Sequence, residues 1–456
     1  IELFRNGSQP DLYPNSNWVD LTMDKHVVTT QHSINFSGGG DKIRYYLGGG
    51  YMYNDNFVRG KNDYRYNLDL SINADVTKWL SVNGGVKYIR NEDTTDRGVP
   101  RFYDLLQVPA IMVAKQSNGE DGSIAGGKQA TLSYIQYNPV RQMERNNWSQ
   151  TYRENTLYTL GADIKPFKGF KISAYGSYKR YEYKSKSYQA LQDGVHNFLT
   201  GCLIPGTAQN TNQMDVNWST NTRLQTNLVA YYDFKILRDH SFNLLAGTSY
   251  ERYTDESLSA SRKNFPSDSF KDLSGGSSSG SDVTNGSSMS EYKLMSYFGR
   301  INYSYKDKYL FEANIRADGS SRFYKDNRWG WFPSFSAGWR ISEESFMKPV
   351  TWVDNLKLRA SCGTLGNINN VGNYDYFQLY SKSGYYSFDD TLVEGIMESK
   401  PANTGLKWEK IAITDVGVDL DLFASKLSFT MDWYLKNTSD ILLGYNVPRE
   451  TGISSN

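Results

Sequence analysis

The feature that most constrains this chain is a long alternation of apolar and polar side chains. Between Trp218 and Ile236 every second residue is apolar or threonine, whereas most residues between them are polar or charged. Successive side chains of a strand point to opposite faces, so this run predicts one long strand with one apolar face. Strands of globular proteins average about five or six residues. An ordinary globular sheet therefore does not explain a run of this length.

Similar runs recur along the chain, and together they predict about fourteen strands. Most of them exceed ten residues, and a tilted strand needs roughly nine to eleven residues to cross a bilayer. The runs lie near residues 25–36, 42–55, 62–75, 79–92, 150–165, 169–186, 218–236, 240–256, 291–306, 309–323, 331–341, 355–364, 407–422 and 426–441.

The connections between these runs alternate in length. Short turns are expected at 37–41, 76–78, 306–308 and 424–425 and around Lys168 and Arg238, with one longer, partly helical connection at 342–355 (helical from Glu343 to Met347). Long connections are expected at 93–149, 187–217, 257–290 and 365–406. An up-and-down path puts the short turns at one end and the long loops at the other, as in an outer-membrane β-barrel.

The composition agrees with such a barrel once the two faces are separated. The mean hydropathy is −0.61, although 14% of the 456 residues are aromatic. A barrel wall needs apolar side chains only on its lipid-facing side, so a low average is compatible with a membrane protein. The net charge of +1 gives no reason to expect nucleic-acid binding. A large soluble all-β protein remains the alternative.

Several segments resemble, in order and spacing, the barrel of SusC-family TonB-dependent transporters of Bacteroidota. They are RNGSQPDLYPNSNWVD (5–20), HSINFSGGGDKIRYYLGGGY (32–51), YLFEANIRADGSSRF (309–323), WGWFPSFSAGWRISEESFM (329–347), NLKLRASCGTLGN (355–367), LKWEK (406–410) and DWYLKNTSDILL (432–443).

This resemblance implies a transmembrane antiparallel β-barrel of twenty-two strands in the outer membrane. It also implies a plug inside the barrel, a TonB box used by the TonB–ExbB–ExbD complex, and a SusD-like surface lipoprotein that covers the outside. We expect residues 1–456 to be one partial barrel domain of about fourteen strands. The signal peptide, plug, TonB box and C-terminal strands are expected to lie outside it.

Catalytic and metal-binding patterns are not expected in this sequence. His26, His32, His196 and His240 have no Cys or acidic partners at metal-site spacing. The GSSSG segment at 276–280 lies in a Ser/Gly-rich stretch and lacks the strand–turn–helix context of a nucleophile elbow. We therefore expect no enzyme activity, no cofactor and no metal site.

Candidate ligand-binding residues lie in two of the long connections. Aromatic rings can stack on the apolar faces of sugars, while amides and carboxylates can bind hydroxyl groups. There are three alternatives. The aromatic residues can pack the loops against their neighbours, the paired acids Asp389 and Asp390 can simply be solvated, or these two acids can contact Ca²⁺. The candidates are Arg101 and Trp148 in 93–149, and Asn367, Asn369, Tyr376, Tyr385, Tyr386, Asp389 and Asp390 in 365–406.

The polar faces of the strands are expected to point into the barrel. Arg223, Arg316 and Asp318 belong to these faces, and salt bridges within the wall or to a plug are the favoured interpretation. The sequence and the resemblance together predict a TonB-dependent nutrient importer. It would be surrounded by outer-membrane lipid and would take up mostly oligosaccharides, or peptides. A passive porin or receptor barrel and a soluble all-β carbohydrate-binding protein are the alternatives.

Overall fold

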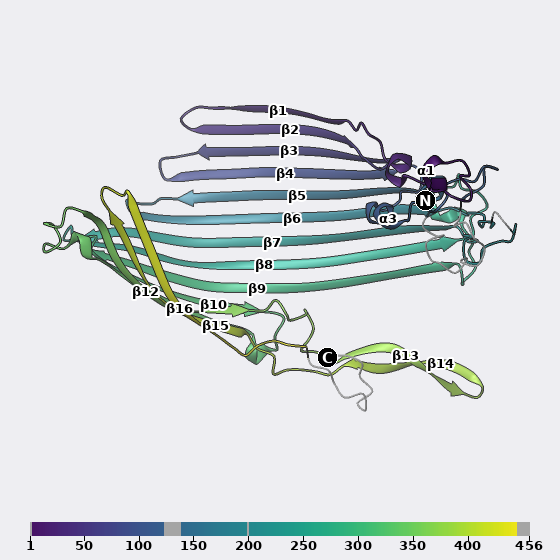
Figure 1. Cartoon of the computed structure of the whole chain (residues 1–456). Coiled ribbons are helices and arrows are strands. Elements are labelled where there is room, and N and C mark those ends of the chain that lie inside the picture. The colour runs from purple at the N-terminus through teal and green to yellow at the C-terminus, as the bar shows by residue number, and fades with distance from the viewer. Residues whose placement is uncertain (1, 123–137, 198–199, 445–456) are drawn as a thin grey trace.

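A computed structural model describes residues 2–122, 138–197 and 200–444, and fourteen strands form a single antiparallel sheet (Figure 1). Each strand pairs with its neighbours along the chain, except that β12 pairs with β15. The strands are β1 (Thr29–Gly39), β2 (Ile43–Asp55), β3 (Lys61–Asp75), β4 (Leu80–Thr95), β5 (Trp148–Ile164), β6 (Phe170–Gln189), β7 (Gln213–Ile236), β8 (His240–Lys263), β9 (Val283–Tyr305), β10 (Tyr309–Ser320), β11 (Trp329–Arg340), β12 (Val353–Asn367), β15 (Glu409–Leu422) and β16 (Leu427–Ser439). The fourteen predicted runs are all present, and the all-β fold class is confirmed.

Helices are few and short. They are α1 (Glu2–Asn6), α2 (Trp18–Thr22), α3 (Phe102–Gln107) and α4 (Pro139–Met143), with 3₁₀ turns η2 (Leu273–Gly275), η3 (Lys325–Asn327) and η4 (Ile341–Glu343). The helical turn predicted from Glu343 to Met347 begins earlier, as η4, and is followed by hydrogen-bonded turns. Within the described residues, no helix has the length and apolar character needed to cross a membrane.

The two faces of the sheet differ in the way that the alternation predicted. Large apolar side chains are exposed along one face, which we call the apolar face; examples are Ile34, Leu68, Leu160, Leu228, Ile301, Phe335 and Met431. The register places these residues on the same side across neighbouring strands, for example Leu228 beside Thr248 and Ala174. The opposite side, the polar face, carries charged and amide side chains such as Arg223, Glu251 and Asp318.

The connections differ strongly between the two ends of the sheet. One end, the short-turn end, is formed by tight turns and by the 341–352 connection. The other end, the long-loop end, is formed by the described parts of the long connections, together with the N-terminal helices (Figure 1). These parts are 96–122, 138–147, 190–197, 200–212, 264–282, 321–328 and 368–408. The predicted segregation of long loops at one end is therefore confirmed.

The connection after β12 contains a hairpin that the alternation did not predict. Strands β13 (Leu379–Phe388) and β14 (Thr391–Lys400) pair with each other and form a separate two-stranded sheet. Figure 1 shows this hairpin projecting away from the main sheet. Segment 365–406 is therefore largely ordered as strands, not as an irregular loop.

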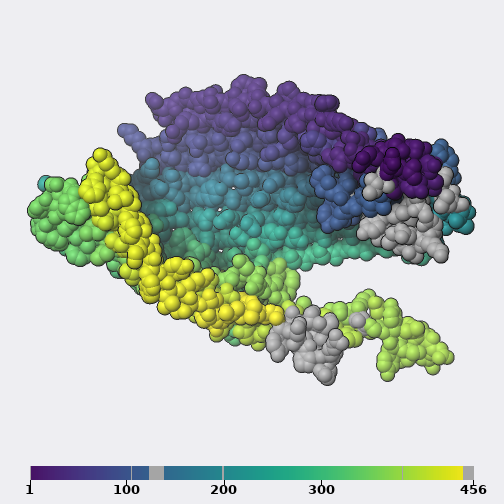
Figure 2. All heavy atoms as spheres, viewed as in Figure 1, coloured from purple at the N-terminus to yellow at the C-terminus, as the bar shows by residue number. Residues whose placement is uncertain are grey.

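The main sheet is curved, and its polar face is hollowed. In Figure 2 the last strands pass in front of one end of the earlier strands, with a recess between them. A cavity of about 1100 Å³ spans β7 to β15 near the short-turn end, and its polar lining includes Asp233, Asn302, Glu312, Arg359 and Asp415. The concave side is thus the polar side, as the interior of a barrel requires.

Candidate substrate-facing surface

Four arginine side chains lie over aromatic rings on or beside the polar face of β5 to β10. The distances from guanidinium carbon to ring centroid are 5.7 Å for Arg153–Tyr183, 5.5 Å for Arg223–Tyr253, 4.4 Å for Arg322–Tyr292 and 5.4 Å for Arg316–Phe298. We call these eight residues the Arg–aromatic band. Each contact lies within the range of a cation–π interaction.

The strand register brings the central members of the band together. Tyr253 and Tyr292 are directly paired across β8 and β9, and their rings stack with centroids 5.1 Å apart. Arg223 pairs with Tyr253 across β7 and β8, so its guanidinium reaches that ring. Cross-strand neighbours on one face of a sheet are close enough for such contacts.

Carboxylates fix the orientation of these arginines. Glu251 accepts a hydrogen bond from the Tyr292 hydroxyl at 2.9 Å and lies 3.8 Å from Nε of Arg223. Arg316 donates to Asp318 at 2.7 Å and to Ser296 Oγ at 2.9 Å. The prediction that Arg223, Arg316 and Asp318 form salt bridges within the wall is confirmed.

A second charged group lies on the polar face nearer the short-turn end. Arg359 on β12 contacts Asp415, Asp419 and Asp432 at 3.5, 3.2 and 2.6 Å. Gly417 lies between them, and a side chain there would overlap Asp432 and the guanidinium of Arg359. This glycine therefore lets one arginine cross β15. Among the described residues, no group of three or more His, Cys, Asp or Glu is placed to hold a metal ion.

The loops above β4 to β7 are joined by a buried arginine. Arg141 lies in the first turn of α4 and is 2% exposed. It contacts Asp121 at 2.9 Å and donates to the carbonyls of Asp193 and Thr207 at 2.6 and 2.7 Å. Burial lowers the pKa of Arg141, with Asp121 opposing this shift. Burial alone would lower the pKa of Lys115, but the hydrogen bonds that it donates to Asp121 and Glu144 raise it. The described parts of connections 96–147 and 190–212 are thus joined through Arg141.

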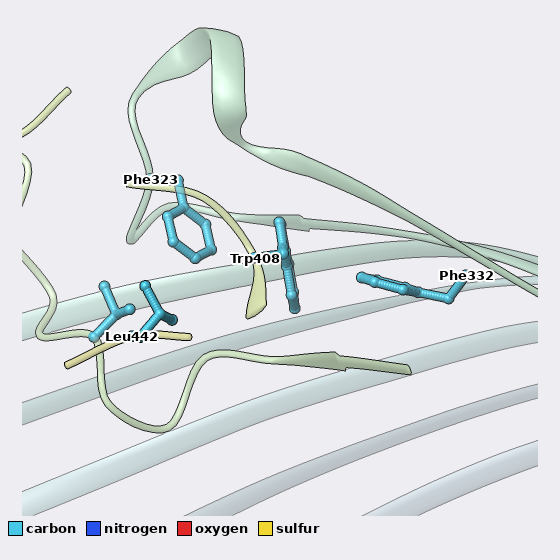
Figure 3. Packing of buried hydrophobic residues seen from close by; sticks show 5 residues of the cluster. Phe323, Phe332, Trp408 and Leu442 are labelled. Atoms are coloured by element: carbon cyan, nitrogen blue, oxygen red, sulfur yellow. The ribbon is translucent and has the colours of Figure 1, made fainter. Parts of the chain in front are cut away.

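A hydrophobic cluster anchors the loops at the other side of the sheet. Phe323, Phe332, Val371, Trp408 and Leu442 are buried together at the long-loop end of β10 to β15 (Figure 3). A side chain at Gly366 would overlap the Phe332 ring, and Trp408 Nε1 donates to the Arg328 carbonyl at 3.0 Å. The cluster therefore positions segment 368–408.

The two candidates from 93–149 do not share a site. Arg101 is exposed and directly precedes α3. Trp148 starts β5 on the side of the sheet that carries Tyr158 and Leu160, which is the apolar face. Its ring stacks on Tyr188 at 6.2 Å and lies 4.2 Å from Nζ of Lys271, whose pKa is lowered by burial.

Two candidates from 365–406 participate in local hydrogen bonds. Asn367 Nδ2 donates to Glu409 Oε1 at 2.8 Å, and Asn367 Oδ1 accepts from the Asn369 amide at 3.0 Å. Tyr376 lies against Phe377, with ring centroids 4.3 Å apart. These contacts show how the side chains are held, and ligand contact by them stays a prediction.

The remaining candidates lie on the β13–β14 hairpin. Tyr385 and Tyr386 are exposed on β13. Asp389 and Asp390 form the two-residue turn, with φ of 48° and 59°. Such turns favour residues that tolerate the left-handed region, which includes Asp. The paired acids therefore have a conformational role in the turn.

Sequence reasoning did not select the Arg–aromatic band. The signal was available, because Tyr181, Tyr183 and Tyr253 share strand parity with polar residues and not with the apolar positions. Only Arg223 and Arg316 were identified as inward-facing. The band was missed because binding residues were sought in loops.

Comparison with known proteins identifies the family. Residues 112–454 match the family described as TonB dependent receptor-like, beta-barrel. The chain belongs to this family. Such barrels are outer-membrane proteins, so the predicted localisation is confirmed.

The relatives also bear out the resemblance to SusC. TonB-dependent receptor P26 of Formosa agariphila is 27% identical over 98% of this chain and 43% of its own length. TonB-dependent receptor SusC of Bacteroides thetaiotaomicron is 40% identical over 165 residues, which are 36% of this chain and 16% of SusC. The chain spans less than half the length of these relatives.

A solved structure shares the fold over the full chain. The structure of the RagAB peptide transporter superposes with a TM-score of 0.75 and 22% identity, covering 100% of this chain and 50% of that chain. At this identity the likeness shows the fold alone. It supports the assignment of the curved sheet as part of a large barrel.

Proposed function

We propose that the chain forms part of the wall of a TonB-dependent importer whose substrates are most often oligosaccharides. The observation that carries this proposal is the Arg–aromatic band on the concave face of a family-matched barrel wall. Aromatic faces with nearby guanidinium and carboxylate groups can bind sugar rings and their hydroxyls. The same groups suit peptides, whose termini and side chains are charged, so peptides are the second candidate class. Transport, and not catalysis, is the proposed activity.

The wall described here would be completed by further strands. The main sheet is open, with β1 and β16 at its edges. In lipid, unpaired strand edges are not tolerated, so β1 and β16 would each need a further strand beside them. We therefore propose that residues 1–456 are one partial domain of a barrel of family size. A plug and a TonB box in the full-length protein would couple it to the TonB–ExbB–ExbD complex.

A SusD-like surface lipoprotein is the proposed partner at the long-loop end. The β13–β14 hairpin supports this proposal because it exposes apolar side chains on a projecting element; these include Tyr380, Tyr385, Tyr386, Leu392 and Ile396. An isolated two-stranded hairpin is marginally stable in water, so a partner surface would stabilise it. The long-loop end would then face the outside of the cell.

The test measures substrate binding and uptake by the full-length protein with its lipoprotein partner. We expect the Tyr253→Ala/Tyr292→Ala variant to weaken binding of oligosaccharides by roughly 30-fold, as loss of central aromatic contacts often does. Tyr178→Ala/Tyr250→Ala, on the apolar face, is the matched control and should bind normally. Equal binding by both variants would refute the proposed surface, and preferential binding of peptides would change the substrate class. Uptake that persists without TonB would favour a passive porin.

A further inference from the structure

The apolar face ends in the same way on four strands. The uninterrupted run of apolar and aromatic side chains, which we call the apolar belt, is followed, at the next position of the same face toward the long-loop end, by a cation. The pairs are Tyr88 and Arg90 on β4, Tyr178 and Arg180 on β6, Tyr250 and Arg252 on β8, and Met295 and Lys293 on β9. We call Arg90, Arg180, Arg252 and Lys293 the cationic row. Beyond the cations, Leu258 and Met289 are separate exposed apolar side chains.

The cationic row follows the tilt of the strands. The residues paired directly across the strands from Arg90 on β4 form a ladder that leads to Glu256 on β8. Arg252 lies four residues from Glu256, toward the short-turn end. Four residues along a strand span about 13 Å and four strands about 19 Å, so the row is inclined by about 35° to the ladder. Barrel strands tilt by about 35–45° from the barrel axis.

The opposite border of the apolar belt shifts in the same direction. The ladder from Leu80 on β4 reaches Ala246, and β8 continues six residues further to His240, beside Tyr305. Both borders therefore run obliquely across the strands. With tilted strands, the cationic row lies parallel to the membrane plane, directly at the edge of the lipid-facing belt.

The cationic side chains of the row are more exposed than the carboxylates with which they form ion pairs. Side chains of Arg180, Arg252 and Lys293 are 49%, 48% and 49% exposed, whereas those of Glu182 and Glu291 are 14% and 25% exposed. Glu182 lies between Arg180 and Lys184 at 2.5 and 2.7 Å, and Glu291 between Arg252 and Lys293 at 2.5 and 2.8 Å. Each of these less exposed carboxylates contacts two cations that lie further out.

The surface between these two groups offers hydroxyls. Thr222 pairs with Arg180 across β6 and β7, and its hydroxyl is 2.6 Å from that of Thr254 on β8. Lys186 extends the positive surface along β6. The acidic neighbours on this face are Glu92 and Glu154 beside Arg90, and the exposed Glu256, which lies further from the belt. Half-exposed guanidinium and ammonium groups with hydroxyl groups between them can bind a phosphate by charge and hydrogen bonds.

We propose that the cationic row binds the phosphate groups of the glycolipid in the outer leaflet of the outer membrane. Lipids that cover the apolar belt must place their headgroups at its border, which is where the row lies. Cations beside an anionic membrane surface each contribute to binding in this way. The proposal rests on the proposed orientation, in which the long-loop end faces outward.

Native mass spectrometry of the delipidated full-length protein tests this inference. The probes are phosphorylated lipid A, its dephosphorylated form, phosphatidylethanolamine and inorganic phosphate. We expect wild-type protein to prefer phosphorylated lipid A, and Arg180→Gln/Arg252→Gln/Lys293→Gln to weaken this binding by at least about tenfold. The matched control, Arg65→Gln/Lys87→Gln/Lys179→Gln on the polar face and outside the Arg–aromatic band, should bind like wild type. A heat-modifiable band on gels confirms that each variant is folded.

Several results would overturn the proposal. One is equal binding of phosphorylated and dephosphorylated lipid A. Another is binding of phosphatidylethanolamine as tight as that of phosphorylated lipid A. A third is undiminished binding of phosphorylated lipid A by the Arg180→Gln/Arg252→Gln/Lys293→Gln variant. If that triple variant fails to fold, two milder variants test the proposal. Arg252→Gln alone should weaken binding of phosphorylated lipid A, and the charge-conserving Arg180→Lys/Arg252→Lys variant should retain it. Lipid binding needs neither substrate nor TonB, so its failure is distinguishable from failure of the importer proposal.

Discussion

Replacement of Arg141 by methionine should open the loops at the long-loop end without unfolding the wall. The substitution keeps an extended side chain but removes the donors to Asp121 and to the carbonyls of Asp193 and Thr207. Loss of one member of a buried ion pair costs about 3–5 kcal/mol. Asp121 keeps Lys115 at 2.7 Å, so the lower value of about 3 kcal/mol applies.

Hydrogen–deuterium exchange of the full-length protein measures this effect. A loss of about 3 kcal/mol corresponds to roughly a hundredfold faster exchange. The effect should appear in peptides covering 108–122, 139–146 and 200–210, while β5 to β9 stay protected. Lys115→Met is the matched control; its ammonium is partly exposed, so a change of less than about 1 kcal/mol is expected. Unchanged exchange in both connections, or equal effects of the two variants, would refute the role of Arg141.

Three further predictions follow from the same structure. Gly366→Ala should displace the Phe332 ring and lower the unfolding temperature through a loss of about 1–3 kcal/mol, whereas Gly176→Ala, where a side chain meets nothing within 4 Å, should be tolerated. Leu228→Arg on the apolar face should destabilise folding into lipid vesicles by about 2–4 kcal/mol, and Asn227→Arg on the polar face should not. Hydrogen bonds donated by Tyr309, Trp339 and Lys308 lower the pKa of Glu344. These hydrogen bonds therefore stabilise the folded protein at pH values above the ordinary carboxyl pKa, and this stabilisation is lost as the pH falls through the lowered pKa. Glu344→Gln should therefore lower the unfolding temperature at pH 7 but lose its effect near about pH 3, and a pH-independent difference would contradict this.

The wall of the protein was predictable because its determinant is local. Alternation in a run such as 218–236 fixes both the strand and its faces, and β7 was found at Gln213–Ile236. The strands extend further into the loops than the alternation indicated, as β8 and β9 do around 257–290. Toward the long-loop end, charged side chains such as Arg252 and Glu256 also occur on the apolar face of β8, so the alternation is less regular there.

The loop end was less predictable because its order depends on distant contacts. Arg141 joins segments 52 and 66 residues away, and no local pattern announces this. Asp389 and Asp390 have positive φ values and form the turn of a hairpin, which the sequence did not indicate; ligand contact by them stays a prediction. The aromatic residues of that segment alternate poorly, so β13 and β14 were not recognised as strands.

The central claim is that the two faces of each strand contact different media. Single cysteines at 226–232 of β7, in the full-length protein with Cys202 and Cys362 replaced by serine, can carry spin labels in reconstituted vesicles. We expect labels at 226, 228, 230 and 232 to collide mainly with oxygen dissolved in lipid. Labels at 227, 229 and 231 should collide mainly with a water-soluble nickel complex or be shielded from both. Equal accessibility at consecutive positions, or nickel access throughout, would contradict a membrane-spanning barrel wall.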